Sequence, residues 1–180
     1  AGGDRVVYST DPDRNSYPAI TNDLPMALRL IAPSRIVTAD VRDELRRGEE
    51  PFSRIMAARA KVPDGGALMV RAIFEPAPLY RVMERHGFAH HTEVLAPDDW
   101  RIWFHPPLVV LDVREMEPPE PMSHTLAALE TLPHNGTLLQ VNVRVPQLLL
   151  PQFAERGFSY EIREPSPGIV HLLVRRVSTV

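Results

Sequence analysis

The 180-residue sequence contains no cysteine. Disulfides, thiolate nucleophiles, persulfide carriers, cysteine-ligated zinc and iron–sulfur clusters are therefore excluded within this sequence. Its hydrophobic content of 44% is sufficient to build genuine apolar cores. No cofactor is required by any sequence feature, and histidine is the only residue type left that favours a transition-metal site.

The sequence also lacks a basic excess and long apolar runs. Lys and Arg total 20 against 23 Asp and Glu, so the formal net charge is -3. Nucleic-acid-binding proteins usually carry a basic excess, and we therefore expect no nucleic-acid partner. No apolar run approaches the roughly 20 residues that span a bilayer. We expect a cytoplasmic protein without a membrane partner, although a targeting segment removed before Ala1 would leave no trace.

What the sequence does contain is an internal repeat. Segments 40–42 (Asp-Val-Arg) and 50–53 (Glu-Pro-Phe-Ser) recur at 112–114 and 120–123, with a two-residue insertion between them in the first copy. Beyond them the two copies align without gaps at an offset of 70 residues: Pro63 with Pro133, Gly66 with Gly136, Leu68 with Leu138, Pro76 with Pro146, Leu79 with Leu149, and Gly87-Phe88 with Gly157-Phe158. Proline and glycine positions that align in this way indicate a tandem duplication.

We predict an N-terminal arm (1–35) and two modules (36–105 and 108–177). Because only His105-Pro106-Pro107 separates the last strand of the first module from the first strand of the second, the modules are expected to pack as a fixed pair, either a monomeric pseudo-dimer or part of a homodimer. In the arm, Val6-Val7-Tyr8 is a candidate edge strand, and Asn22 or Asp23 is a candidate cap for a helix that runs to Pro33. The arm is expected to cover apolar area on a module; the alternative is an arm exchanged across a dimer.

Each module is predicted to read β-α-β-α-β-β. Short apolar runs indicate the strands, and prolines at helix starts and glycines at helix ends delimit the helices. The predicted elements are strands at 36–41 and 108–113, first helices from Pro51 and Pro121, strands at 67–73 and 137–143, second helices from Pro78 and Leu148 to Gly87 and Gly157, and final hairpins at 90–104 and 159–174, with turns at 96–99 and 164–168. The crossover helix makes the first two strands parallel.

The stretch 111–122 resembles the signature of the TusA/SirA-like sulfur-carrier superfamily, Leu-Asp-x-Arg-Gly-x-x-Cys-Pro-x-Pro. Both copies are also similar to a bacterial domain of unknown function grouped with that superfamily, through segment 74–80 and Gly87-Phe88. The resemblance spans 36–105 and 108–177. It implies an α/β two-layer sandwich, in which two helices lie on one face of a four-stranded mixed sheet.

The sequence departs from this signature at its reactive residue, the cysteine. Sulfur carriers place a cysteine at the start of the first helix, where the helix terminus lowers the thiol pKa. Here that position is Pro118, and Gly48 in the first copy. Persulfide transfer is therefore excluded at both sites, and only the structural part of the motif is left.

Two sets of polar residues are candidate sites. Arg42 and Arg114 each lie two residues after an aspartate, which favours a structural ion pair or cap, with anion recognition as the alternative. Glu75 and Tyr80 flank the start of the second helix, and an exposed tryptophan such as Trp103 would mark an interface. These five residues are the tentative ligand-binding set.

Histidines form the second set. His86, His90, His91 and Glu93 cluster around a helix end and a strand start, without the i, i+4 spacing of helical zinc sites. We predict a non-catalytic binding or accessory protein that acts on a protein partner or a small molecule. The alternative is a metal-dependent enzyme or metal-sensing regulator that uses these histidines. Because most polar candidates lie in the first module, we expect that module to carry the function and the second to complete the scaffold.

Overall fold

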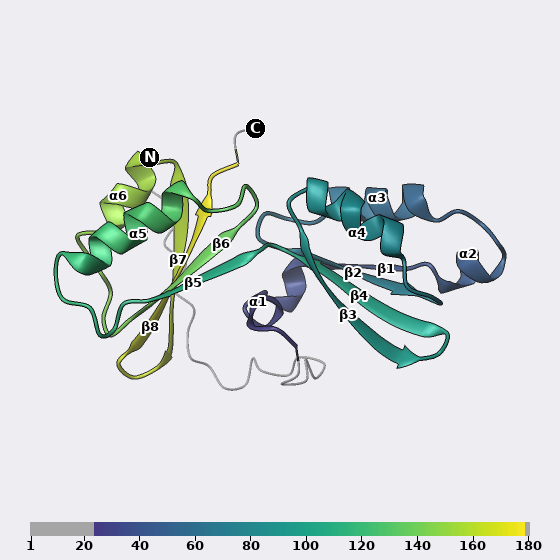
Figure 1. Cartoon of the computed structure of the whole chain (residues 1–180), viewed down its shortest axis with the longest axis horizontal. Coiled ribbons are helices and arrows are strands. Elements are labelled where there is room, and N and C mark those ends of the chain that lie inside the picture. Colours follow the sequence, from purple (N-terminus) through teal and green to yellow (C-terminus); the bar gives the residue numbers. More distant parts are fainter. Residues whose placement is uncertain (1–23, 179–180) are drawn as a thin grey trace. The chain divides into compact units, whose positions relative to one another are not determined.

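The computed structural model describes residues 24–178 (Figure 1). The described residues divide into two compact units at Pro107 and Leu108, so each unit holds one module. No helix within 24–178 is long and apolar enough to cross a membrane.

The first module contains one four-stranded sheet with strand order β1-β2-β4-β3. Its elements are β1 (Ile36–Asp40), α2 (Arg42–Arg46), α3 (Phe52–Ala60), β2 (Ala67–Ala72), α4 (Ala77–Arg85), β3 (Ala89–Ala96) and β4 (Asp99–His105). Strands β1 and β2 are parallel, as expected for a crossover through a helix, and the other two pairs are antiparallel.

The second module repeats this topology, with strand order β5-β6-β8-β7. Its elements are β5 (Leu108–Asp112), α5 (Glu120–Glu130), β6 (Thr137–Asn142), α6 (Leu150–Glu155), β7 (Phe158–Ser166) and β8 (Ile169–Arg176). The register repeats as well: Leu68 pairs with Phe104 and Leu138 with Val174. The predicted α/β class, with a four-stranded mixed sheet in each tandem β-α-β-α-β-β module, is confirmed.

Each module buries its core between the sheet and two helices. In the first, α3 and α4 lie over one face of the sheet, and Ile55 and Met83 from these helices pack against Val70 and Phe104 (Figure 1). In the second, α5 and α6 supply Leu129 and Phe153 to an equivalent cluster. Because side chains alternate across a strand, residues next to these positions point to the opposite face of the sheet.

Two elements differ from the sequence-based expectation. Helix α2 was not predicted, because it lies mostly in the stretch between the repeated motifs, where the two copies differ in length, and includes only one apolar side chain, Leu45. The hairpin turns are shorter than predicted: the strands continue to Ala96 and Ser166, and only Pro97-Asp98 and Pro167-Gly168 form turns. Gly168 adopts a φ of 75°, which favours glycine.

The described part of the arm lies on the face of the first sheet that α3 and α4 leave open. Helix α1 (Met26–Arg29) is followed by the 3-10 helix η2 (Pro33–Arg35). Leu28, together with Leu24 and Ile31, packs against Ala67 and Trp103. This segment therefore covers apolar area on a module, as expected.

The α1 helix is shorter than predicted. It begins after Pro25 and is only four residues long, rather than running to Pro33. Pro33 instead opens the separate helix η2, since a proline cannot supply the backbone N–H that would continue α1. The candidate edge strand 6–8 and the candidate caps Asn22 and Asp23 lie outside the described residues.

Candidate functional site

One pocket lies in the second module, where β5 and β6 end beside the first turn of α5. Its volume is about 590 Å³, within the usual range for small-molecule sites. The lining residues come from two segments, 113–122 and 142–149, together with one strand residue. They are Val113, Arg114, Met116, Pro118, Pro119, Pro121, Met122, Gln140, Asn142, Val143, Arg144, Val145, Pro146, Gln147, Leu148 and Leu149.

Three buried polar side chains form a connected ladder at this pocket. Thr125, on α5, is fully buried, and its hydroxyl lies 2.7 Å from Gln140 Oε1 and 2.6 Å from the carbonyl oxygen of Pro121. Gln140 Nε2 donates to Asn142 Oδ1 at 3.0 Å. Gln140 is 0% exposed and Asn142 6%, and both line the pocket. The side chains of Gln140 and Asn142 thus form a polar wall of the pocket, on the face of strand β6 that points toward the core.

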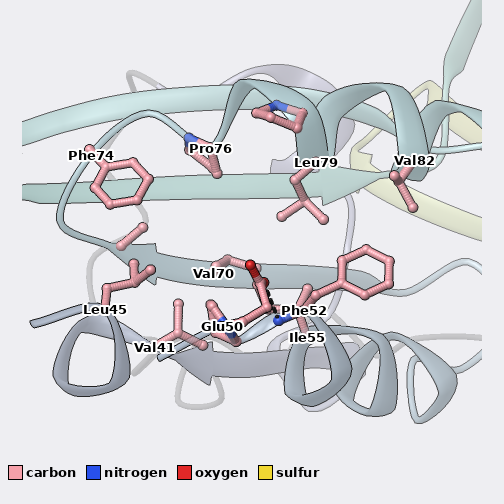
Figure 2. Close-up of a pocket in the computed structure, with 13 residues that line it drawn as sticks. Val41, Leu45, Glu50, Phe52, Ile55, Val70, Phe74, Pro76, Leu79 and Val82 are labelled. Atoms are coloured by element: carbon pink, nitrogen blue, oxygen red, sulfur yellow. Dashed lines mark hydrogen bonds between the residues drawn. The ribbon is translucent and has the colours of Figure 1, made fainter. Parts of the chain in front are cut away.

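The first module has a smaller pocket in the equivalent place, of about 210 Å³ (Figure 2). Its lining is almost wholly apolar, with Val70, Ala72 and Phe74 where the second module has Gln140, Asn142 and Arg144. The sole ionisable lining residue is Glu50, whose Oε1 accepts a hydrogen bond from the backbone N–H of Phe52 at 2.9 Å. Figure 2 shows this bond among the side chains that line the pocket.

The two modules are therefore related as an apolar and a polar version of one pocket. Ile55, Val70 and Ala72 of the first module correspond to Thr125, Gln140 and Asn142 of the second. The fold is thus built without polar groups at these positions, whereas burying an amide or hydroxyl is unfavourable unless it is hydrogen-bonded. The sequence predicts the polar site in the first module and an apolar scaffold in the second. In the structure the pocket of the second module is the more polar of the two.

Both predicted Asp–Arg pairs form. Arg114 contacts Asp112 through Nε and NH2, at 2.9 and 2.7 Å, and hydrogen bonds from Arg114 hold the pKa of the Asp112 carboxyl below its usual value. Arg42 contacts Asp40 in the same way, at 2.9 and 2.6 Å, and its NH1 also reaches Asp99 at 3.4 Å. Arg114 lines the larger pocket, whereas Arg42 lines neither pocket.

Arg42 belongs instead to a charged cluster at the end of the first sheet. Arg71 donates to both carboxylate oxygens of Asp99, at 2.6 and 2.5 Å, and this lowers the pKa of Asp99. Asp99 thereby connects Arg71 with Arg42. The second module has Val141 and Ile169 at the positions of Arg71 and Asp99, so this cluster is a feature of the first module alone.

The other tentative ligand-binding residues do not converge. The Tyr80 hydroxyl hydrogen-bonds Thr92 at 2.8 Å and donates to the exposed Glu75 at 3.3 Å. Trp103 is 8% exposed and lies on the opposite face of the sheet, where its Nε1 donates to Glu93 at 2.7 Å. Glu75, Tyr80 and Trp103 are absent from both pocket linings, and Trp103 lies on the other side of the sheet from the hydrogen-bonded pair Tyr80 and Glu75.

The histidine set is dispersed in the same way. His86 is the exposed C-cap of α4, while the ring of His90 stacks on Tyr80 with centroids 4.0 Å apart. His91 pairs with Trp103 across the sheet and therefore faces the other side from His90. Within residues 24–178 no three histidine or acidic side chains form a group that could hold a metal ion.

The comparisons with known proteins identify both modules. The sequence profile of a family described as "Uncharacterized conserved protein (DUF2249)" matches residues 38–106 and 110–176. The chain belongs to this family. It carries two tandem DUF2249 domains, which together account for most of its length. No curated protein and no solved structure matches the chain.

The residues that distinguish the second DUF2249 domain were not among the sequence-based candidates. Gln140, Asn142 and Arg144 lie in and just after a strand that reads as apolar overall. The available signal was the alignment of the two copies, in which these three residues replace Val70, Ala72 and Phe74. Polar substitutions on the buried face of one copy are informative because buried polar groups are uncommon.

Proposed function

We propose that this protein is a non-catalytic binding or accessory protein that holds a small ligand in the second-module pocket. The observation that carries the proposal is the buried Thr125–Gln140–Asn142 ladder, which opens onto a pocket of about 590 Å³. The equivalent first-module positions are apolar, so stability alone does not require the ladder. Convergent polar groups in a largely apolar pocket are typical of ligand sites.

We further propose that the two DUF2249 domains share the TusA/SirA-like sulfur-carrier fold while lacking its chemistry. In support, Pro118, Pro119 and Pro121 line the second-module pocket at the loop where the superfamily signature has Cys-Pro-x-Pro. The sequence has no cysteine with which to carry sulfur at that loop. On this proposal, the loop that carries the reactive cysteine in sulfur carriers lines a binding site in this chain.

The ligand-binding proposal is tested by a fragment screen that is read by amide chemical shifts of the labelled full chain. Binding is expected to shift signals from residues 113–122 and 140–149. The matched control is the variant Gln140→Val/Asn142→Ala, which carries the first-module residues at both positions. Fragments that shift wild type and leave the variant unchanged support the proposal. A screen without any response in these two segments overturns it.

A further inference from the structure

The charges that line the second-module pocket are all of one sign. Arg114 and Arg144 are its ionisable lining residues, and no carboxylate from the described part of the chain lines it. Arg114 is already neutralised by its two-point contact with Asp112. The exposed Arg144 makes no ion pair or side-chain hydrogen bond with the described part of the chain. Among the described residues, the pocket therefore offers one guanidinium without a counter-charge, a group suited to binding a carboxylate.

Asn142 adds a hydrogen-bond donor next to this charge. Its side-chain amide has two N–H groups, and within residues 24–178 the acceptor it contacts is the carbonyl oxygen of Gln140, at 3.4 Å. At least one N–H of a side chain that is 6% exposed is thus left to donate into the pocket that it lines. Arg144 lines the same pocket two residues further along the chain. A ligand oxygen that accepts a hydrogen bond from Asn142 would therefore also be attracted by the positive charge of Arg144.

The first module shows what this place in the fold accepts. There a carboxylate of the chain itself, that of Glu50, lines the pocket and accepts a hydrogen bond from the backbone of Phe52 (Figure 2). The corresponding Glu120 is exposed, like Glu50, but does not line the second-module pocket. Compared with the first-module pocket, the second-module pocket thus gains a cation that has no ion-pair partner in residues 24–178, and it lacks a carboxylate in the lining that these residues supply.

The remaining walls of the pocket are apolar. Met116, Met122, Val143 and Leu148 contribute side chains, of which Val143 and Leu148 are 55% and 83% exposed. Methionine side chains adapt to ligands of varied shape. The walls are suited to an apolar body attached to the polar end that Arg144 and Asn142 would hold.

We infer that the ligand of the second-module pocket is a small organic acid, whose carboxylate pairs with Arg144 and accepts a hydrogen bond from Asn142 while its apolar body packs on Met116, Met122 and Leu148. This inference rests on the proposed function and specifies its ligand class.

Three probes of equal chain length test the inference: hexanoate, hexanamide and hexylammonium, each titrated into the labelled full chain and followed by amide chemical shifts. Hexanoate is expected to bind at residues 113–122 and 140–149, and to bind most tightly of the three. Arg144→Gln should weaken hexanoate about tenfold, the effect of losing one charge-assisted hydrogen bond, while the response to hexanamide stays within about twofold.

Arg156→Gln is the matched control, because it removes the same charge from the same module at a residue outside the pocket lining. It should leave the affinity for hexanoate unchanged. Equal affinity for hexanoate and hexanamide, equal loss in both arginine variants, or hexanoate shifts confined to the first-module groove would each overturn the inference.

Failure of the inference is distinguishable from failure of the proposed function. If hexanamide or hexylammonium binds this pocket and hexanoate does not, the carboxylate assignment is wrong and the binding site stands. If none of the three binds, the carboxylate assignment also fails, and the fragment screen described above decides separately whether the pocket binds any small molecule.

Discussion

Gln140 Nε2 donates a hydrogen bond to Asn142 Oδ1 at 3.0 Å, although both residues point from strand β6 toward the core of their module. Residues two apart on a strand share a face, and in the first module the same two positions hold Val70 and Ala72. The pair therefore replaces a simple apolar contact with an amide chain that is anchored on Thr125 and ends at a pocket.

The ladder should be dispensable for folding. The triple variant Thr125→Ile/Gln140→Val/Asn142→Ala carries the first-module residues, so its free energy of unfolding should equal or exceed that of wild type, because exchanging all partners for apolar groups of similar shape is nearly neutral or stabilising. Gln140→Ala alone should cost about 2–4 kcal/mol, since it removes the donor to Asn142 Oδ1 and opens a cavity, while Thr125 keeps its hydrogen bond to Pro121. Urea denaturation followed by circular dichroism measures both variants.

Tryptophan fluorescence provides the internal control for this comparison. The two tryptophans, Trp100 and Trp103, both lie in the first module, so their emission follows that module while circular dichroism follows both. A triple variant that loses several kcal/mol would show that the ladder is a structural requirement of the second module and would remove the main support for a binding role.

The contact between α1 and the first sheet predicts a different effect. Leu28 is 1% exposed and packs with Trp103, so Leu28→Ala should destabilise the first module by about 2–4 kcal/mol. It should also make Trp103 more accessible to acrylamide in a Trp100→Phe background. Met26→Ala, on the same helix and 44% exposed, is the control and should change stability by less than about 0.5 kcal/mol. Equal effects of the two substitutions would contradict this packing.

The dispersed histidines predict that added metal will not stabilise the protein. His90 stacks on Tyr80, while His91 lies on the opposite face of the sheet. The melting temperature of chelator-treated protein should therefore be unchanged by zinc or iron(II), because a ligand stabilises a fold only when it binds the native state. A rise in melting temperature that disappears in His86→Ala/His90→Ala/His91→Ala would restore the metal-dependent alternative.

Most of the fold could be predicted from the sequence, because the duplication gives two aligned copies of the same order of strands and helices. Paired turn signals such as Gly66 with Gly136 delimit the same strands in both copies, and the apolar runs between them predict the buried strands. Helix α2 is not evident from the sequence because it lies mostly between the repeated motifs, where the copies differ in length and no aligned second copy supports it. Helix α1 is shorter than its apolar pattern predicts, because the chain leaves the helix after Arg29 and Pro33 opens a separate helix.

The candidate site was much less accessible. Arg114 was a candidate and lines the pocket, but Arg42, Glu75, Tyr80 and Trp103 do not. Charged residues are the usual candidates for binding sites in a sequence. Gln140 and Asn142 are uncharged and lie in an otherwise apolar strand, where a polar side chain is normally expected on the solvent-facing side. Only the pairing of β6 with its neighbours and the packing of α5 show that this face is buried.

The buried His105 makes the stability of the first module depend on pH. Its side chain is 7% exposed, and burial lowers the pKa of the imidazole, against the opposing effect of the hydrogen bond between Nδ1 and the carbonyl oxygen of Pro106, at 2.8 Å. The nearby His91 and His90 lower this pKa further. Folding therefore favours the neutral ring.

The sign of the effect follows from proton linkage. Because the folded pKa lies below the unfolded value of about 6.5, the unfolded chain takes up the proton first as the pH falls. The free energy of unfolding should therefore be constant above about pH 7.5, decrease as the pH falls through 6.5, and level off below the folded pKa. Urea titrations followed by tryptophan fluorescence between pH 7.5 and about 5.5 measure this slope for the first module, above the range in which the carboxylates titrate. His105→Gln keeps a donor for Pro106 without titrating, so its slope should be smaller than that of wild type; an equal slope in the two proteins would assign the pH dependence to other groups.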